Sequence, residues 1–253
     1  MKKALALVMA LALCALALCA CGAPERESQT WELYVAAGMK KPMDVVAQRY
    51  MDETGDTINI NYSSSGALFS QIEQGQPCDL YFTADWLYVE KMEEIDLCEE
   101  KAGYLNDNVV LVVSESAKDK IKSFEDLTKE GVTIAICDVG APVGLYAENG
   151  LRAMGLWDAA EKNVVTRPST VNQAAIMVLQ DEVDAACIFS SVANSNGLEN
   201  VDVMTNEESG EIVFATVVVK GGNTKVAKEF VEFANKDENL KEFEKYGWVR
   251  YEK

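Results

Sequence analysis

Apolar and polar positions along this chain switch repeatedly between a strand-like and a helix-like spacing. Short runs rich in Val, Ile and aromatic residues are followed by longer amphipathic segments. The predicted strands are residues 31–37, 57–62, 79–83, 109–113, 132–137, 164–165, 185–189 and 211–219, and the predicted helices are 42–53, 68–74, 86–94, 143–154, 171–180, 224–235 and 238–245. This alternation predicts an α/β protein built on a parallel sheet that helices cover.

Several of the predicted strand-to-helix turns carry small or hydroxyl residues. They are residues 36–38, 63–66, 140–144 and 169–172. In open α/β sheets, ligands bind beyond the carboxyl ends of the strands, where such turns gather. Each helix N-terminus offers unpaired backbone N–H groups and a partial positive charge, so several of them around one cleft would bind an anion without Lys or Arg. Any one of these turns alone is typical of an ordinary helix cap, so the prediction depends on their joint occurrence.

The N-terminal residues follow a different pattern, which is typical of an export signal. Lys2 and Lys3 precede an almost purely apolar run over residues 4–18, and a small residue then precedes Cys21. The apolar run has about 15 residues, fewer than the roughly 20 that span a bilayer. An uncleaved membrane helix is therefore the weaker alternative, and no second apolar run of spanning length follows in the sequence.

The residues around Cys21 resemble the cleavage site of bacterial lipoproteins. Leu18 stands three positions before Cys21, Ala20 directly before it and Gly22 directly after it. The resemblance implies that residues 1–20 are a signal peptide and that Cys21 becomes the first residue and carries lipid. Residues 21–29 would then be a polar tether, and the protein would lie outside the cytoplasm, anchored to the bacterial cell membrane.

Composition excludes several classes of function. Without residues 1–20 the chain has 21 basic and 41 acidic side chains, a formal charge of −20. Binding to nucleic acid is excluded because it requires a basic patch, whereas an anionic ligand is not excluded, because charges beyond a Debye length of about 8 Å are largely screened. The absence of His excludes the usual Ser-His-Asp and Cys-His machinery and removes the commonest zinc ligand. Widely spaced Cys78, Cys98, Cys137 and Cys187 do not form a metal-binding motif and are expected to be single buried thiols.

Three stretches of the sequence resemble the molybdate-binding proteins of bacterial ABC importers, which have the type II periplasmic-binding-protein fold. They are YVAAGM at 34–39, YSSSGALFSQIEQGQPCDLYFTAD at 62–85, and APVGLYA at 141–147 leading into GLWD at 155–158. KYGW at 245–248 also fits, and the similarity covers essentially all of residues 31–251. The second stretch is the most specific, because its Ser run, its helix and its following strand occur at the spacing of the family.

The resemblance implies two α/β lobes, each a mostly parallel sheet flanked by helices, with a ligand cleft between them. Two crossovers would join the lobes, near residues 106–110 and 212–215. Lobe 1 would then comprise residues 30–107 and 214–253, and lobe 2 residues 108–213.

The resemblance also implies how an oxyanion is held, by two Ser hydroxyls, backbone N–H groups and a Tyr hydroxyl. Carried over by position, the second Ser is Ser65, and backbone donors fall near Val143 and Val171. Gly38 stands in place of the first Ser and Phe189 in place of the Tyr. Two of the three hydroxyls are therefore absent, and each missing partner of a buried anion costs about 1–3 kcal/mol.

Other groups near these positions are candidates to replace the missing hydroxyls. They are Ser64, Ser190, a trapped water, and the pair Lys40 and Lys41, although a solvated helix start is the favoured interpretation for the two lysines. The predicted ligand-binding set is Gly38, Ser64, Ser65, Val143, Val171 and Phe189, with no metal ligand and no catalytic residue.

The expected function is that of an extracytoplasmic lipoprotein that binds molybdate or tungstate, closes like a hinge, and delivers the ion to a permease and ATPase complex. It would act as a monomer without a cofactor. A first alternative is another small anion or organic carboxylate, since Gly38 and Phe189 would leave room for a larger or less polar ligand. An exported enzyme using Asp79 and Asp85 is a second alternative, although these residues are more typical of a strand start and a helix cap. A surface adhesion or scaffold lipoprotein is a third.

Overall fold

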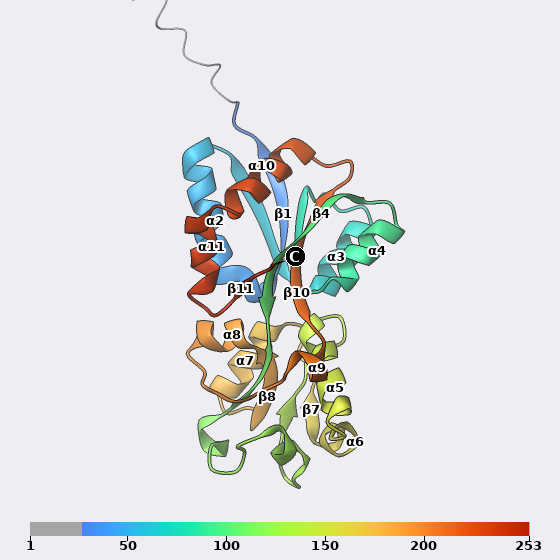
Figure 1. The fold of residues 1–253 in the computed structure, drawn as a ribbon, viewed down its shortest axis with the longest axis vertical. Helices are drawn as coiled ribbons and strands as arrows, with labels where there is room; N and C mark the ends of the chain where they lie inside the picture. Colours follow the sequence, from blue (N-terminus) through green and yellow to red (C-terminus); the bar gives the residue numbers. More distant parts are fainter. Residues whose placement is uncertain (1–26, 253) are drawn as a thin grey trace, which may run out of the picture.

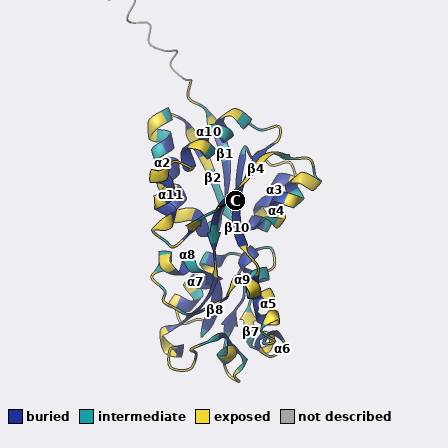
Figure 2. Cartoon of the chain, viewed as in Figure 1, coloured by how far each residue is buried: buried dark blue, intermediate teal, exposed yellow. Residues whose placement is uncertain are grey.

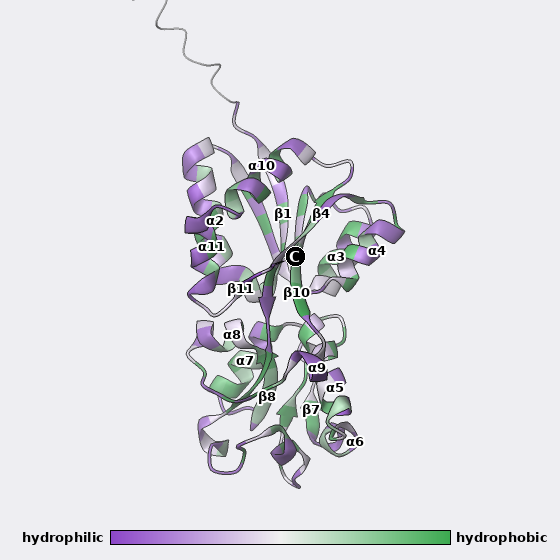
Figure 3. Cartoon of the chain, in the orientation of Figure 1, coloured by the Kyte–Doolittle hydropathy of each residue, from purple (hydrophilic) through white to green (hydrophobic). Residues whose placement is uncertain are grey.

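The computed structural model describes residues 27–252, which form two β-sheets flanked by helices (Figure 1). The predicted signal peptide, residues 1–20, and the predicted lipid attachment at Cys21 lie outside the described residues. Within residues 27–252, no helix combines the length and the apolar composition that crossing a bilayer requires. The central strands of both sheets are largely buried (Figure 2) and apolar (Figure 3), while the outward faces of the helices are exposed and hydrophilic.

The first sheet, which we call sheet A, has the strand order β11-β4-β10-β3-β1-β2. Its strands are β1 (Thr30–Ala36), β2 (Thr57–Ser63), β3 (Leu80–Thr83), β4 (Cys98–Asp107), β10 (Ile212–Val219) and β11 (Val249–Arg250). Its helices are α2 (Lys40–Thr54), α3 (Ser65–Glu73), α4 (Leu87–Glu94), α10 (Thr224–Ala234) and α11 (Asp237–Glu244). A 3₁₀ turn, η1 (Ala37–Met39), joins β1 to α2 without a break. Sheet A and these helices form the half that we call half A.

Helices cover both faces of sheet A, and they bury both sides of β1. Successive side chains of a strand point to opposite faces, and Leu33 and Val35 belong to one core cluster with Met43 of α2 and Phe230 of α10. Tyr34, between them, belongs to a second cluster with residues of α3 and α4. A strand that is apolar on both sides is typical of a sheet between two helical layers.

The second sheet, sheet B, has the order β7-β6-β8-β5-β9. Its strands are β5 (Val109–Val113), β6 (Ile134–Ala135), β7 (Val164–Thr166), β8 (Ala185–Phe189) and β9 (Asn200–Val203). Its helices are α5 (Pro142–Ala153), α6 (Trp157–Ala160), α7 (Val171–Leu179), α8 (Ser190–Asn196) and α9 (Asn206–Ser209), and 3₁₀ turns lie at Glu115–Ala117, Phe124–Thr128 and Glu161–Asn163. Sheet B and these helices form half B.

Two neighbouring connections carry the chain between the halves. Strand β4 ends at Asp107 in sheet A and β5 begins at Val109 in sheet B, while β10 returns to sheet A with Ile212 paired to Asp107. Figure 1 shows the two halves meeting at this crossing. The exact lobe boundaries expected from the sequence stay a prediction.

The expectation of mostly parallel sheets is wrong, because both sheets are mixed. In sheet A, β1 is parallel to β2 and β3, but β10 is antiparallel to β3 and β4, and β11 to β4. In sheet B, β6 is parallel to β7 and β8, but β5 is antiparallel to β8 and β9. The physical reason is the crossing. Strands β5 and β10 arrive from the opposite half, so each enters its sheet at the end that faces that half. The neighbouring strands β8 and β3 end there, so β5 and β10 run antiparallel to them.

The sequence pattern missed β4, β9, β11, α6, α8 and α9. Four of the ten residues of β4 are exposed, and its residues Glu99, Glu100 and Lys101 interrupt any apolar alternation. Its pairing with β10, not its own composition, makes it a strand. Helix α8 has the sequence SSVANSN, whose polar residues are poor helix formers.

Candidate functional site

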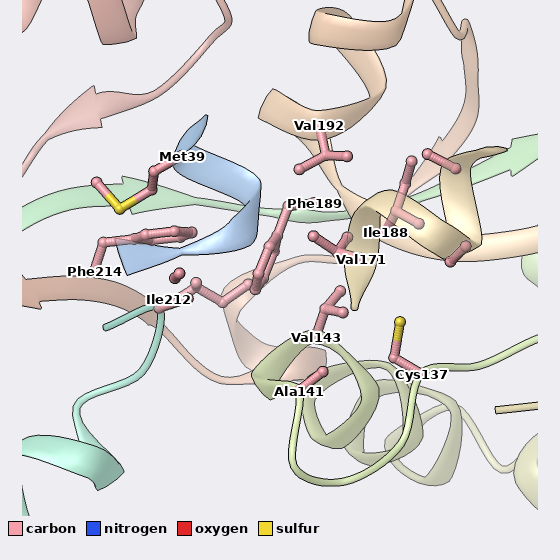
Figure 4. Packing of buried hydrophobic residues seen from close by; sticks show 14 of the residues in the cluster. Met39, Cys137, Ala141, Val143, Val171, Ile188, Phe189, Val192, Ile212 and Phe214 are labelled. Carbon is pink, nitrogen blue, oxygen red and sulfur yellow. The ribbon is translucent and has the colours of Figure 1, made fainter. Parts of the chain in front are cut away.

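A small cavity lies between the halves, and Gly38, Ser64, Ser65, Val143, Val171 and Phe189 all line it. Its volume is about 20 Å³, somewhat more than the 10–15 Å³ or so that one water molecule requires. The other lining residues are Ala36, Ala37, Ala84, Ala141, Pro142, Thr170 and Phe214. Figure 4 shows Val143, Val171, Phe189 and Phe214 around the same space. The structure therefore brings together every residue of the predicted ligand-binding set.

The cavity collects the N-terminal ends of helical segments from both halves. Half A contributes η1, which continues into α2, and α3; half B contributes α5 and α7. The first N–H groups of a helix have no partner inside it. Ala36 and Ala141, which precede η1 and α5, make no side-chain cap bond. Backbone donors near Gly38 and Val143 are thus left for another partner, and the helix ends make this region electrically positive.

Ser65 is fully buried at the start of α3, and the fold holds it firmly. Its Oγ accepts a hydrogen bond of 3.0 Å from the Ala84 N–H, and its carbonyl accepts one of 2.8 Å from the Tyr81 hydroxyl. Because Ala84 uses a lone pair of Oγ, the hydroxyl proton can still be donated. This geometry suits the oxyanion donor that the sequence analysis expects at Ser65.

Ser64 and Thr170 serve as helix caps at the edge of the cavity. Ser64 Oγ accepts from the Ala67 N–H at 3.4 Å, and Thr170 Oγ1 accepts from the Gln173 N–H at 3.3 Å. These are the ordinary capping roles that Ser and Thr have at helix starts. Both hydroxyls keep a proton that can be donated to a ligand.

Gly38 and Phe189 do not enlarge the cavity. A Cβ atom on Gly38 would lie 3.1 Å from Val192 Cγ2 and 3.4 Å from Val171 Cγ1, so neighbouring side chains already fill that space. Phe189 is only 2% exposed and packs edge-on against Phe214 with ring centroids 5.3 Å apart. The extra room expected for a larger ligand is therefore absent, because apolar side chains replace the missing hydroxyls.

Lys40, Lys41 and Ser190 do not line the cavity. Lys40 Nζ lies 2.8 Å from Asp44 Oδ2 and 4.4 Å from the centre of the Tyr62 ring, and Lys41 Nζ donates to the Ser195 carbonyl across the two halves. The interpretation of the lysines as a solvated helix start agrees with this geometry for Lys40. These two cations hold surface and inter-half contacts, so the donors at the cavity are backbone and hydroxyl groups.

Asp79 and Asp85, the carboxylates considered for an enzyme, bind backbone N–H groups. Asp79 accepts from Glu32 N at 2.7 Å and from Asn223 N at 2.5 Å. Asp85 Oδ1 accepts from Leu87 N at 2.8 Å at the start of α4, and burial raises the pKa of this carboxyl. Both carboxylates therefore fix the chain, and neither lines the cavity.

The four expected thiols are free, and most of them are buried. Cys78, Cys137 and Cys187 are buried, whereas Cys98 is only half-buried. Burial raises the pKa of Cys137 and of Cys187 to about 12, which makes these thiols unreactive. Within the described residues, no cluster of His, Cys, Asp and Glu side chains has an arrangement that could hold a metal ion.

Hydrogen bonds from one half to the other surround the cavity. Gly66 N and the Tyr88 hydroxyl, both in half A, donate to the Gly140 carbonyl of half B at 2.9 and 3.3 Å. Asn172 Nδ2 of half B donates to the Ala37 carbonyl of half A at 2.7 Å. The structure is therefore a closed form, in which the donors from both halves face one small space.

Of the lining residues, Ala84 and Phe214 were not predicted from the sequence. Ala84 lies inside the resembling stretch at 62–85 and supplies the N–H that holds Ser65, so its position after β3 was a usable signal. Phe214 lies within the predicted strand 211–219. Its place in the cavity wall depends on the crossing of β10 between the halves, which no local pattern indicates.

Comparison with known proteins adds independent information about this chain. The family model for bacterial extracellular solute-binding proteins matches residues 32–249. YvgL of Bacillus subtilis, whose name describes it as a candidate ABC transporter substrate-binding lipoprotein, is 30% identical over 87% of this chain and 86% of its own length. The molybdate-binding protein ModA of Escherichia coli is 25% identical over 86% of this chain and 88% of its own length. The structure of the periplasmic molybdate-binding protein of Azotobacter vinelandii matches 88% of this chain and all of that chain with a TM-score of 0.76 at 20% identity, a likeness of fold.

Proposed function

The chain belongs to the family of bacterial extracellular solute-binding proteins, and on this basis we propose that it binds molybdate or tungstate in the cavity between its halves. Its relatives bind solutes and are not enzymes. The proposal further assigns the bound ion to an ABC importer, to whose permease and ATPase the closed protein delivers it. Molybdate binding by ModA of Escherichia coli supports the choice of ligand.

The observation that carries the proposal is the chemistry of the cavity lining. Helix N-termini and the hydroxyls of Ser64, Ser65 and Thr170 provide donors, and no lining residue is acidic or basic. Helix N-termini bind anions through their N–H groups and their partial charge. Because no carboxylate lines the cavity, no negative charge there repels a bound anion. A protonated anion also finds no carboxylate to which it could donate a hydrogen bond. A fully ionised oxyanion is therefore preferred over phosphate, whose ions all carry at least one proton near neutral pH.

The small volume restricts the ligand further. The cavity of about 20 Å³ holds little more than one water molecule, so a tetrahedral oxyanion requires the halves to move slightly apart, and a sugar phosphate or another extended molecule would require much more. The apolar wall of Phe189, Phe214 and Val143 excludes water. Hydrogen bonds to an ion are stronger in such surroundings than in water.

Thermal unfolding of residues 22–253 with a panel of anions tests the proposal. A ligand that binds only the folded state adds about 4 kcal/mol at a thousand times its dissociation constant. We expect molybdate and tungstate to raise the melting temperature, and sulfate, phosphate and small carboxylates to have little effect. Stabilisation by a carboxylate alone, or by none of the anions, would contradict the proposed ligand.

Ser65→Ala, measured by calorimetry in the same panel, tests the binding mode. Loss of a hydrogen bond to a charged ligand costs about 1.5–3 kcal/mol, so molybdate affinity should fall at least tenfold. The ligand-free melting temperature of the variant provides the control, since Ser65 also holds Ala84. Unchanged affinity would show that Ser65 does not contact the ion.

The proposed location of the protein rests on the N-terminal sequence. We propose that Cys21 carries lipid and anchors the protein to the outer face of the cell membrane. The name of YvgL as a lipoprotein supports this assignment. As for assembly, we propose that the protein acts as a monomer, since one chain supplies the whole lining of the cavity.

A further inference from the structure

We infer that Asn172 is a positioning residue for ligand binding, because its side-chain amide holds the Ala37 carbonyl from the opposite half and so aims the Gly38 N–H at the cavity. The inference rests on the proposed function of the cavity. Asn172 does not itself line the cavity, and no position of the resembling stretches pointed to it.

The contact joins the starts of two helical segments. Asn172 is the second residue of α7 in half B, and Ala37 is the first residue of η1 in half A. The distance from Asn172 Nδ2 to the Ala37 carbonyl oxygen is 2.7 Å. The same carbonyl also accepts from the Lys40 N–H, so both of its lone pairs are used. Its direction is therefore fixed from two sides.

Fixing this carbonyl also fixes the neighbouring N–H group. The Ala37 C=O and the Gly38 N–H belong to one planar peptide unit, which is trans. In a trans peptide these two groups point in opposite directions. Because the Ala37 carbonyl points at Asn172, the Gly38 N–H points away from Asn172, and Gly38 itself lines the cavity that we infer this N–H faces.

The Gly38 N–H is also free to bind a ligand. It lies in the first turn of the helical stretch that begins at η1 and continues as α2, where N–H groups have no partner inside the helix. Ala36, the preceding residue, makes no side-chain cap bond. Hydrogen bonds to a carbonyl polarise the peptide and strengthen its N–H as a donor. Asn172 therefore supports the donor at the position where Gly38 provides no hydroxyl.

The arrangement couples binding to closure. Asn172 reaches Ala37 only when half B lies against half A, so this second hold on the peptide of the Gly38 donor exists only in the closed form. Asn194 provides a matched comparison. Its Nδ2 donates to the Tyr246 carbonyl at 2.8 Å, also from half B to half A, but neither residue lines the cavity.

The experiment compares Asn172→Ala, Asn172→Gln and Asn194→Ala in residues 22–253, with molybdate as the probe. We expect Asn172→Ala to weaken binding about tenfold, the loss of one hydrogen bond of about 1.4 kcal/mol. Asn172→Gln keeps the amide and should recover part of the affinity, and Asn194→Ala should change it less than about twofold. Nuclear magnetic resonance of the Gly38 amide gives a second readout. Its shift on adding molybdate should be large in the parent protein and small in Asn172→Ala.

Two results would overturn the inference when the parent binds molybdate. One is parent-like affinity in Asn172→Ala, and the other is an equal loss in Asn194→Ala, which would indicate general closure only. If the parent binds none of the anions, the proposed function fails, and the ligand-free Gly38 amide decides the inference. Asn172→Ala must then move that resonance and speed its hydrogen exchange more than Asn194→Ala does; otherwise the inference fails as well.

Discussion

Gly38 and Phe189 show that an absent hydroxyl does not imply an empty space. Both stand where the sequence resemblance implies a hydroxyl side chain, and the sequence alone left open a larger ligand. Val192 and Val171 pack against Gly38, and Phe214 packs against Phe189. At the scale of single residues, the site thus has apolar packing at the two positions where the resemblance implies hydroxyl donors. Backbone N–H groups, which no substitution except Pro removes, keep the chemistry suited to an anion.

Asp107 is a second residue whose surroundings decide its behaviour. It is buried at the end of β4, where its Oδ1 accepts from Asn108 N at 2.7 Å and Ser191 N at 3.3 Å, and its Oδ2 accepts from the Ser191 hydroxyl. These bonds favour the charged form, but burial outweighs them and raises the pKa of Asp107 to about 7. The group joins the end of sheet A to the start of α8 in half B.

The raised pKa makes stability depend on pH in a defined direction. An unfolded Asp has a pKa of about 3.9, so between about pH 4 and pH 7 the folded state keeps a proton that the unfolded state has lost. The stabilisation is complete below about pH 4 and is lost as the pH rises through 7. From pH 5 to pH 8, Asp107 should lower the free energy of unfolding by about 1–3 kcal/mol. Urea unfolding at several pH values measures this.

Asp107→Asn is the matched control, because an amide of the same shape does not titrate in this range. Its free energy of unfolding should fall less between pH 5 and pH 8 than that of the parent. Parallel pH profiles for the two proteins would show that Asp107 titrates normally.

At the scale of elements, the start of α5 depends on the absence of a side chain at Gly144. A Cβ there would lie 2.3 Å from the Cys137 carbonyl oxygen and 2.8 Å from that of Asp138. Both obstacles are backbone atoms, which cannot turn away. The helix therefore lies directly on the loop after β6, and this contact places Val143 at the cavity.

Gly144→Ala should destabilise the protein by about 1–3 kcal/mol, the usual cost of overpacking, and should weaken molybdate binding by moving Val143. Gly150→Ala in the same helix is the control, since its Cβ would meet the flexible Met204 side chain, and Ala favours a helix over Gly by about 1 kcal/mol. Urea unfolding compares the two variants. Equal losses would mean that the contact with the loop does not matter.

The elements also show which patterns a sequence displays clearly. Strands β5 and β8 begin and end where the apolar runs predicted. Both are fully buried, so every residue of each strand is apolar and the run has clear ends. Strand β6 is only Ile134–Ala135, although the apolar run extends over residues 132–137. Burial in the core keeps the rest of that run apolar without strand pairing.

At the scale of the whole molecule, the two halves are held together around the cavity, and we propose that a lipid anchor holds the protein at the membrane. Closure brings the donors of α3 and η1 to those of α5 and α7, and inter-half bonds at Gly140 and Ala37 hold them there. In our proposal the anchor keeps this hinge close to the permease, so that a released ion is captured without diffusing away.

The proposed anchor leads to a prediction about location. In a bacterial cell the parent protein should fractionate with the membrane, and Cys21→Ser should appear in the soluble extracytoplasmic fraction, because a serine hydroxyl does not replace the thiol that receives the lipid. Cys19→Ser is the control, since Cys19 would be removed with the signal peptide. Immunoblots of cell fractions measure the distribution. Membrane retention of Cys21→Ser equal to that of the parent would contradict lipid attachment at this residue.

The sequence by itself determined the α/β class, most helices and strands, the family resemblance and the set Gly38, Ser64, Ser65, Val143, Val171 and Phe189. It could do so because the buried positions of each helix or strand recur at a regular spacing and are apolar. The residues of a turn are likewise selected by the local backbone conformation. The tertiary structure decided the rest: the mixed sheets, strand β4, the filled space beside Gly38, Phe214 in the cavity wall, and the bond from Asn172 to Ala37. Each of these depends on two segments far apart in the chain, and a contact between such segments leaves no period in either one.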